Sequence, residues 1–216
     1  MNTSLKKRFF TSITLLILLF LMFIDNLVLG YMLILLGVFS FLEFVRINKL
    51  AFNKKKILQF SINIIFLSYV FLFCSFFLAS SYYAHLKFIL FLILITCIFS
   101  DIGGYVFGKI LKGPKLTKIS PRKTIAGAIG SLVFSVILIA IIFYFVTKKI
   151  DIFILFVGLM TSIGCQFGDL FISLMKRKAS LKNTGNLLPG HGGILDRVDG
   201  ILLGLPVGFV TLILIS

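Results

Sequence analysis

Seven runs of apolar residues, each close to the length needed to cross a bilayer, follow one another along this chain. A helix needs about 20 apolar residues to span a hydrocarbon core roughly 30 Å thick. Because 59% of the residues are hydrophobic and only 13% are charged, too little polar surface remains for a soluble enzyme, a disordered chain or a secreted disulfide scaffold. We predict an all-α, polytopic integral membrane protein with about seven transmembrane helices, at residues 9–24, 27–45, 57–79, 86–107, 125–146, 152–175 and 198–215.

The basic residues are distributed unevenly between the two sides of this predicted layout. The chain holds 22 Lys and Arg against 7 Asp and Glu, and 19 of these cations fall in the N-terminal segment and in alternate loops on the same side. Lys and Arg are retained on the cytoplasmic side of membrane proteins. We therefore predict a cytoplasmic N-terminus, and the net charge of +15 does not indicate a nucleic-acid partner.

The character of the sequence changes along the chain. Residues 1–95 are mainly Phe, Leu and Ile and are predicted to form the first three transmembrane helices and the start of the fourth. Residues 96–216 contain most of the Gly, Pro, Asp, Lys and Ser of the loops, and we assign the catalytic region to them. Both parts are predicted to belong to a single membrane-embedded domain.

Carboxylates are rare, and four of the seven are predicted to lie at or within the cytoplasmic ends of helices. Asp25 and Asp151 are expected to be solvated turn residues, and Glu43 is expected to pair with Arg46, three residues further on. An ionisable group at membrane depth is costly and by default indicates a functional site. The four acids of interest are Asp101, Asp169, Asp196 and Asp199.

Helical spacing places several of these acids beside polar residues. Asp169, Ser173 and Lys176 share one helix face, and Asp196 and Asp199 share another. Converging carboxylates suit Mg²⁺, which prefers hard oxygen ligands and binds through one or two carboxylates together with substrate phosphates. The alternative is that each Asp pairs with a Lys or Arg and only stabilises helix packing.

Two loops combine cations with small residues. Residues 108–130 interleave Lys with Gly, Ser and Pro, which is the composition of a phosphate cradle of backbone N–H groups and ammonium ions. Residues 189–193 read Pro-Gly-His-Gly-Gly, and their glycines allow a ligand to approach the backbone closely. The alternative is that these cations only set topology and contact anionic lipid head groups.

Residues 173–199 resemble the signature of the phosphatidate cytidylyltransferases, or CDP-diacylglycerol synthases. The family pattern is, in outline, S-x-x-K-R-x4-K-D, followed by P-G-H-G-G-x-x-D-R-x-D. Three further blocks agree with the family, at residues 101–109, 120–124 and 168–170. The resemblance covers roughly residues 96–205. Asn183 departs from the signature where an Asp is usual, and Ala126 stands where many members have Glu.

The resemblance implies an enzyme that transfers a cytidylyl group from CTP to phosphatidate, giving CDP-diacylglycerol and pyrophosphate. It implies roles for sixteen residues. The metal ligands would be Asp169, Asp196 and Asp199; the catalytic residues Ser173, Lys176, Arg177, His191 and Arg197; and the substrate-binding residues Asp101, Tyr105, Ser120, Arg122, Lys123, Lys182, Gly192 and Gly193.

The resemblance also implies the surroundings of the enzyme. Mg²⁺ is the expected cofactor, with a second cation whose identity the sequence leaves open. CTP, phosphatidate and the bilayer are the expected partners, a homodimer is an expectation at the level of the family, and no nucleic acid is expected. The location implied is a bacterial-type inner membrane, with the active site facing the cytoplasm.

Three other functions are compatible with parts of the sequence. An inactive relative acting as a membrane partner subunit is suggested by Asn183 and Ala126. A lipid or anion transporter would use buried charges, but transporters often show repeats and midplane charges, which this sequence lacks. A CDP-alcohol phosphotransferase would carry an Asp-rich motif that we do not find.

Overall fold

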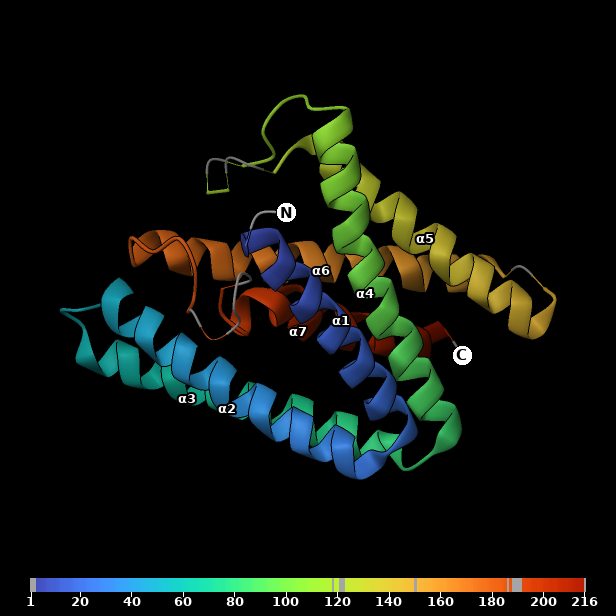
Figure 1. Cartoon of the computed structure of the whole chain (residues 1–216), viewed down its shortest axis with the longest axis horizontal. Coiled ribbons are helices and arrows are strands. Elements are labelled where there is room, and N and C mark those ends of the chain that lie inside the picture. Colours follow the sequence, from blue (N-terminus) through green and yellow to red (C-terminus); the bar gives the residue numbers. More distant parts are fainter. Residues whose placement is uncertain are drawn as a thin grey trace. The chain divides into compact units, whose positions relative to one another are not determined.

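The computed structural model describes residues 3–117, 119–120, 123–149, 151–185, 187 and 192–215, with side chains from Phe10 onward. Within these residues the chain forms seven helices and no β-strand, and an isolated bridge joins Lys115 to Thr124 (Figure 1). The helices are α1 (Thr3–Ile24), α2 (Asn26–Ala51), α3 (Lys56–Ser81), α4 (Ala84–Ile110), α5 (Ile125–Thr147), α6 (Ile152–Lys178) and α7 (Leu195–Ile215).

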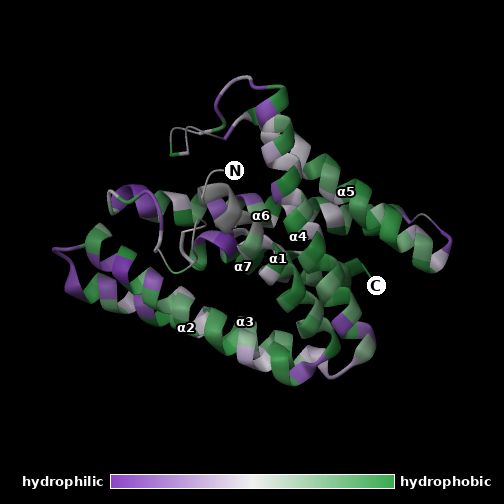
Figure 2. Cartoon of the chain, in the orientation of Figure 1, coloured by the Kyte–Doolittle hydropathy of each residue, from purple (hydrophilic) through white to green (hydrophobic). Residues whose placement is uncertain are grey.

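The structure confirms the predicted fold class, that of an all-α integral membrane protein. Within the described residues, α2 to α7 are each long and apolar enough to cross a bilayer, whereas the apolar part of α1 is the shorter segment Phe10–Ile24. Figure 2 shows apolar residues along the helices and polar residues concentrated in the connecting segments. The apolar runs therefore located all seven helices.

Several helices continue beyond the apolar runs that predicted them. α2 extends to Ala51 and α6 to Lys178, and α7 already begins at Leu195. A hydropathy pattern detects only the part of a helix that lies in lipid, whereas the helix can continue into the polar region. The earlier start of α7 places Asp196 in its first turn.

The chain divides into two compact units, which we call unit 1 and unit 2. Unit 1 comprises Met1–Lys87 and Met175–Val198, and unit 2 comprises Phe88–Leu174 and Asp199–Ser216. The segment from the end of α6 to the start of α7 thus belongs to the same unit as α1, α2 and α3. The predicted assignment of chemistry to residues 96–216 is a functional division and stays a prediction.

Unit 1 is built on the hairpin of α2 and α3, which lie side by side (Figure 1). The rings of Phe44 and Phe66 stack between them with centroids 3.8 Å apart. Asp25 is the N-cap of α2, since its carboxylate accepts a hydrogen bond from the Leu27 N–H at 2.8 Å. Near the other end of the hairpin, the buried Asn48 amide donates to Asn63 Oδ1 at 2.7 Å.

Unit 2 is packed through small residues, as is common between helices in lipid. A Cβ atom added to Gly103 of α4 would lie 2.6 Å from the Gly130 carbonyl oxygen of α5. A Cβ atom on Gly164 of α6 would lie 2.9 Å from the Gly204 Cα of α7. These glycines allow backbones to meet directly, so the polar groups carried by the same helices are held at short range.

Candidate active site

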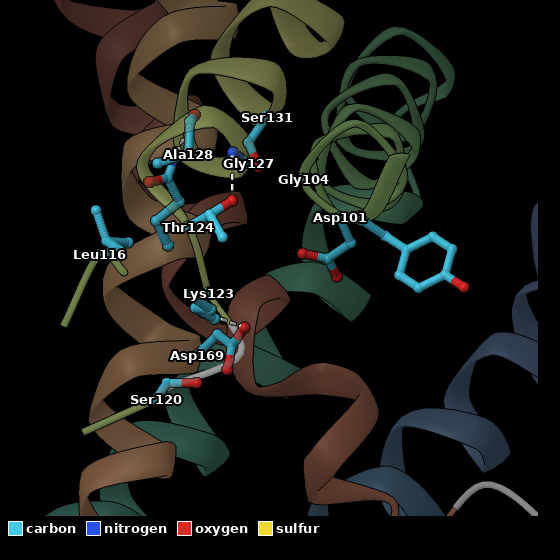
Figure 3. A pocket seen from close by; sticks show the side chains of 12 residues that line it. Asp101, Gly104, Leu116, Ser120, Lys123, Thr124, Gly127, Ala128, Ser131 and Asp169 are labelled. Carbon is cyan, nitrogen blue, oxygen red and sulfur yellow. Dashed lines mark hydrogen bonds and ion pairs between the residues drawn. The ribbon is translucent and has the colours of Figure 1, made fainter. Parts of the chain in front are cut away.

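A cavity of about 330 Å³ lies within unit 2, a size within the range of small-molecule pockets. Its lining comes from α4, the loop before α5, the first turns of α5, and α6 (Figure 3). Two carboxylates, one ammonium group and several hydroxyl groups are among its side chains. The lining residues are Asp101, Gly104, Tyr105, Leu116, Ser120, Lys123, Thr124, Gly127, Ala128, Ser131, Gln166 and Asp169.

The centre of one cavity wall is an ion pair between the Lys123 ammonium group and the Asp169 carboxylate (Figure 3). The Ser173 hydroxyl donates to the other oxygen of Asp169, Oδ1, at 3.2 Å. This hydrogen bond confirms the predicted common face of Asp169 and Ser173 on α6. Side-chain exposure is 27% for Lys123 and 30% for Asp169, so both groups remain accessible to a polar ligand.

The loop before α5 is folded so that Ser120 and Lys123 reach the cavity. The Leu116 N–H donates to the Lys123 carbonyl at 2.8 Å, and the Lys123 N–H donates to the Ser120 carbonyl at 3.0 Å. Thr124 caps α5, because its hydroxyl accepts a hydrogen bond from the Gly127 N–H at 3.1 Å. The helix start beside the cavity supplies a partial positive charge that favours an anionic ligand.

The opposite wall of the cavity is formed by α4. Figure 3 shows the Asp101 carboxylate on this side, facing the space between α4 and the Lys123–Asp169 pair. Tyr105 lines the cavity one turn later on the same helix. The structure therefore brings together five of the predicted site residues in one pocket: Asp101, Tyr105, Ser120, Lys123 and Asp169.

The donor atoms of this pocket fit a hard divalent cation. Asp101 and Asp169 supply carboxylate oxygens, and Ser120 and Thr124 supply hydroxyl oxygens, which are the ligand types that Mg²⁺ takes together with phosphate. Among the described residues, no three His, Cys, Asp or Glu side chains gather where they could hold one metal ion. The three-carboxylate site of Asp169, Asp196 and Asp199 stays a prediction.

A second cluster of predicted site residues lies in unit 1. Lys176 Nζ is 2.6 Å from Asp196 Oδ1, and both side chains are largely buried. The other oxygen, Asp196 Oδ2, accepts hydrogen bonds from the N–H groups of Thr184 at 2.8 Å and Gly193 at 3.4 Å. One carboxylate thus links the end of α6, the segment that follows it, and the start of α7.

Both clusters contain the Lys–Asp pairs that the helix-packing alternative anticipated. The pair in unit 2 differs from a packing contact because it lines a cavity with five further hydroxyl or carboxyl side chains. The pair in unit 1 is buried at the junction of the signature residues.

The end of α6 is fixed by a specific turn that positions the Lys176 region. Ser180 has a left-handed backbone with φ of +56°, the Leu181 N–H donates to the Lys176 carbonyl at 2.8 Å, and the Ser180 N–H donates to the Arg177 carbonyl at 3.0 Å. This pair of bonds is the Schellman motif, which satisfies the last carbonyls of a helix. It reverses the chain immediately after the signature cations.

The expectation that Glu43 pairs with Arg46 is wrong. In the described part of the chain, the ion pairs join Lys123 to Asp169 and Lys176 to Asp196. The Glu43 side chain instead accepts hydrogen bonds from Thr184, Ile194 and Leu195. The exposed Arg46, three residues along α2, offers one cation in solvent. The start of α7 instead offers buried N–H donors that need an acceptor.

The remaining predicted residues have different positions. Asp199 lies where α7 meets α6 within unit 2, because a Cβ atom on Gly168 would overlap its carbonyl oxygen. Gly192 has φ of +88°, which a side chain would oppose. Arg177, Lys182 and Arg197 have exposed side chains. Arg122 and His191 lie outside the described residues.

Three polar residues of the cavity had no role assigned from the sequence. Thr124, Ser131 and Gln166 line the pocket, and the Gln166 amide donates to the Ala128 carbonyl at 3.1 Å. Gln166 could have been identified from the sequence, because it is a polar residue in an apolar span, three residues before Asp169. Thr124 belongs to the block at residues 120–124 but was given no role, and Ser131 is a hydroxyl residue of a kind common in membrane helices. Ala126, one of the departures from the signature, does not line the cavity.

The helices and the cavity define an integral membrane protein with a pocket that contains two carboxylates, one ammonium group and several hydroxyl groups. The chain belongs to the cytidylyltransferase family, whose sequence model matches residues 9–215. It is 42% identical over 130 residues to the phosphatidate cytidylyltransferase of Staphylococcus haemolyticus, and 44% identical over 130 residues to that of Staphylococcus aureus strain COL. Each match covers 59% of this chain and 50% of the relative, so the chain spans about half the length of these curated relatives.

Proposed function

We propose that this protein transfers a cytidylyl group from CTP to phosphatidate, producing CDP-diacylglycerol and pyrophosphate. The observation that carries the proposal is the unit 2 pocket, in which Lys123 and Asp169 lie among hydroxyl groups in a member of the cytidylyltransferase family. The curated relatives named phosphatidate cytidylyltransferase support the choice of phosphatidate as the acceptor.

The proposed reaction needs no activated protein nucleophile. A phosphate oxygen of phosphatidate attacks the α-phosphorus of CTP and forms a new P–O bond. The bond from the α-phosphorus to the bridging oxygen breaks, and pyrophosphate leaves with the electron pair. Because the attacking oxygen is already anionic, the main barrier is repulsion between two polyanions, which positioned cations and hydrogen-bond donors reduce.

The described side chains can supply these cations and donors. Lys123 places an ammonium group in the pocket, and Ser120 and Thr124 add hydroxyl donors beside it. Lys176, held by Asp196, and the exposed Arg177 and Arg197 are proposed phosphate ligands outside the pocket. Ser173 is proposed to orient the Asp169 carboxylate through its hydrogen bond.

Mg²⁺ is the proposed cofactor, and it would neutralise phosphate charge when bound. Asp169, with Asp101 on the opposite wall of the pocket, is the proposed primary ligand. Asp196 and Asp199 are proposed as further ligands from their place in the signature. A second cation of unspecified identity is part of the same proposal.

The excess of basic residues on one side supports a cytoplasmic N-terminus and a site that faces the cytoplasm, where CTP is present. We propose the inner membrane of a bacterium as the location, in line with the staphylococcal relatives. A homodimer is proposed as the assembly.

The proposal is tested with the purified chain in detergent, labelled CTP, phosphatidate and Mg²⁺. We expect CDP-diacylglycerol from the wild type, loss of product after chelation with EDTA, and recovery on adding Mg²⁺. Asp169→Asn and Asp196→Asn should each abolish the product. Asp151→Asn is the matched control, because Asp151 is exposed and only caps the start of α6, which Asn also does well.

If the folded wild type makes no product, the proposed enzymatic activity is refuted, and the alternative of an inactive relative is favoured. Full activity in Asp169→Asn would show that Asp169 is not a ligand of the metal.

A further inference from the structure

A buried carboxylate on α2 lies apart from every residue of the family signature. Glu43 is 5% exposed, although α2 is one of the helices long and apolar enough to span a membrane. Burying such a group is costly unless hydrogen bonds satisfy it. An acid at this position therefore needs a structural or functional reason beyond helix formation.

Both oxygens of Glu43 are engaged by the segment that connects α6 to α7. Oε1 accepts a hydrogen bond from the Ile194 N–H at 3.1 Å, and Oε2 accepts from the Leu195 N–H at 3.0 Å. Oε2 also accepts from the Thr184 hydroxyl at 2.7 Å. The first N–H groups of a helix have no partner within the helix, so Glu43 supplies from another helix the acceptor that the start of α7 requires.

The same segment is shaped to admit the Glu43 carboxylate. A Cβ atom added to Gly185 would overlap Oε1 of Glu43, and one added to Gly193 would overlap both the carboxylate and the Thr184 hydroxyl. Gly193 is the last residue of the Pro-Gly-His-Gly-Gly sequence. Its lack of a side chain thus makes room for a protein carboxylate, whereas the sequence pattern suggested room for a ligand.

Thr184 connects Glu43 to the ion pair of the signature. Its hydroxyl donates to Glu43, while its N–H donates to Asp196 Oδ2 at 2.8 Å. Asp196 Oδ1 in turn pairs with Lys176 Nζ at 2.6 Å. The Thr184 side chain is fully buried. The chain of contacts Glu43–Thr184–Asp196–Lys176 lies entirely within unit 1.

We propose that Glu43 is a positioning residue, which fixes Thr184, Ile194 and Leu195 and through them the orientation of Asp196 and Lys176. The inference rests on the proposed function only in taking Asp196 and Lys176 to serve cytidylyl transfer. It extends the functional machinery to α2, an N-terminal helix outside the signature at residues 173–199.

The test compares Glu43→Gln and Glu43→Asp with the matched control Ser40→Ala. Gln keeps the size but turns an NH₂ group toward hydrogen-bond donors, whereas Asp keeps the carboxylate. Ser40 is equally buried on the same helix, and its hydroxyl has no hydrogen-bond partner in the described structure. Thr184→Val, alone and combined with Glu43→Gln, tests whether the two residues act together.

The first measurement is hydrogen–deuterium exchange of the full chain in detergent, followed on peptides that cover residues 192–198. We expect Glu43→Gln to speed exchange of the Ile194 and Leu195 amides about tenfold or more, because each loses a hydrogen bond to a carboxylate. Glu43→Asp should restore part of the protection, and Ser40→Ala should leave exchange unchanged. The Thr184→Val and Glu43→Gln effects should be less than additive.

The second measurement is kcat/KM for CTP per folded molecule, with folded protein quantified by size-exclusion chromatography. We expect kcat/KM to fall about tenfold or more in Glu43→Gln and to recover in part in Glu43→Asp. Ser40→Ala should keep the wild-type kcat/KM. A purely structural Glu43 would lower the folded yield without changing kcat/KM per folded molecule.

The two measurements separate the inference from the proposed function. If the wild type makes no CDP-diacylglycerol, the function fails, while the exchange experiment still decides whether Glu43 fixes the segment. Unchanged exchange in Glu43→Gln, or unchanged kcat/KM in an active protein, overturns the inference. If Glu43→Gln does not fold, the same two measurements on Glu43→Asp and Thr184→Val decide whether the inference holds.

Discussion

The contact between α4 and α5 leaves no room for a side chain at Gly130. An added Cβ atom would overlap the Phe107 Cβ and Cγ atoms and lie 2.9 Å from the Gly103 carbonyl oxygen. Neither Phe107 Cβ nor a backbone carbonyl can rotate away, so the helices must separate in Gly130→Ala. Overpacking of this kind costs about 1–3 kcal/mol.

The propensity of Ala for helices offsets part of this cost, so a second glycine is needed as a reference. In Gly30→Ala on α2, the new Cβ atom would meet the Leu78 Cδ1 atom at 3.7 Å, an ordinary contact. That substitution should stabilise by up to ~1 kcal/mol. The difference between the two variants isolates the steric cost of about 1–3 kcal/mol. At ~2–4 °C for each kcal/mol, Gly130→Ala should melt about 2–12 °C below Gly30→Ala.

The measurement is the apparent Tm of both variants in the same detergent, together with their affinity for CTP. Because α4 and α5 both line the pocket, Gly130→Ala should also bind CTP more weakly, while Gly30→Ala should bind as the wild type does. Equal melting temperatures would refute the inferred close approach of α4 and α5. A lower Tm with unchanged CTP affinity would show that the contact between α4 and α5 stabilises the protein without shaping the CTP site.

Two further variants test single contacts. Asp25→Ala removes the acceptor for the Leu27 N–H at the start of α2 and should destabilise the protein by about 0.5–2 kcal/mol without affecting transfer; the check is its Tm and activity beside those of Asp25→Asn, which retains the cap. Lys123→Gln removes the ammonium group from the pocket and should lower kcat by about 10²–10³, as loss of a preorganised charge does. Wild-type kcat in Lys123→Gln would exclude this lysine from stabilising the transferred phosphate.

The number and order of the helices could be predicted from hydropathy because each span needs a long apolar run. The ends could not, since α6 and α7 continue into polar residues that carry no hydropathy signal. The consequence is clearest at Asp196, which lies in the first turn of α7 although the apolar run predicted a later start.

The polar residues of the pocket were partly predictable. Asp101 and Asp169 were identified because acids in apolar helices are rare, and Lys123 and Ser120 because they belong to a recognised block. Gln166 was missed although its context resembles that of Asp169. Spacing along a helix orders residues on one face, but it carries no information about which faces meet.

Glu43 shows the limit of local reasoning most directly. Its partners are Thr184, Ile194 and Leu195, which lie more than a hundred residues away in the sequence. The nearest cation, Arg46, was the only partner that spacing could offer. The buried donors at the start of a helix become visible only when the tertiary structure shows which acceptor reaches them.

The close approach at Gly168 has a consequence for which substitutions this protein can accumulate. A side chain there would strike the backbone carbonyl of Asp199, and no replacement at residue 199 removes a carbonyl. A side chain at Gly204 would strike chiefly the Cys165 sulfur atom, which a smaller residue at 165 would remove; its contacts with the Cys165 backbone nitrogen and the Cys97 sulfur atom, both at 3.1 Å, need only a small shift. The second position can therefore change together with its neighbour, whereas the residue preceding Asp169 has no compensating partner and should stay glycine wherever this helix contact is kept.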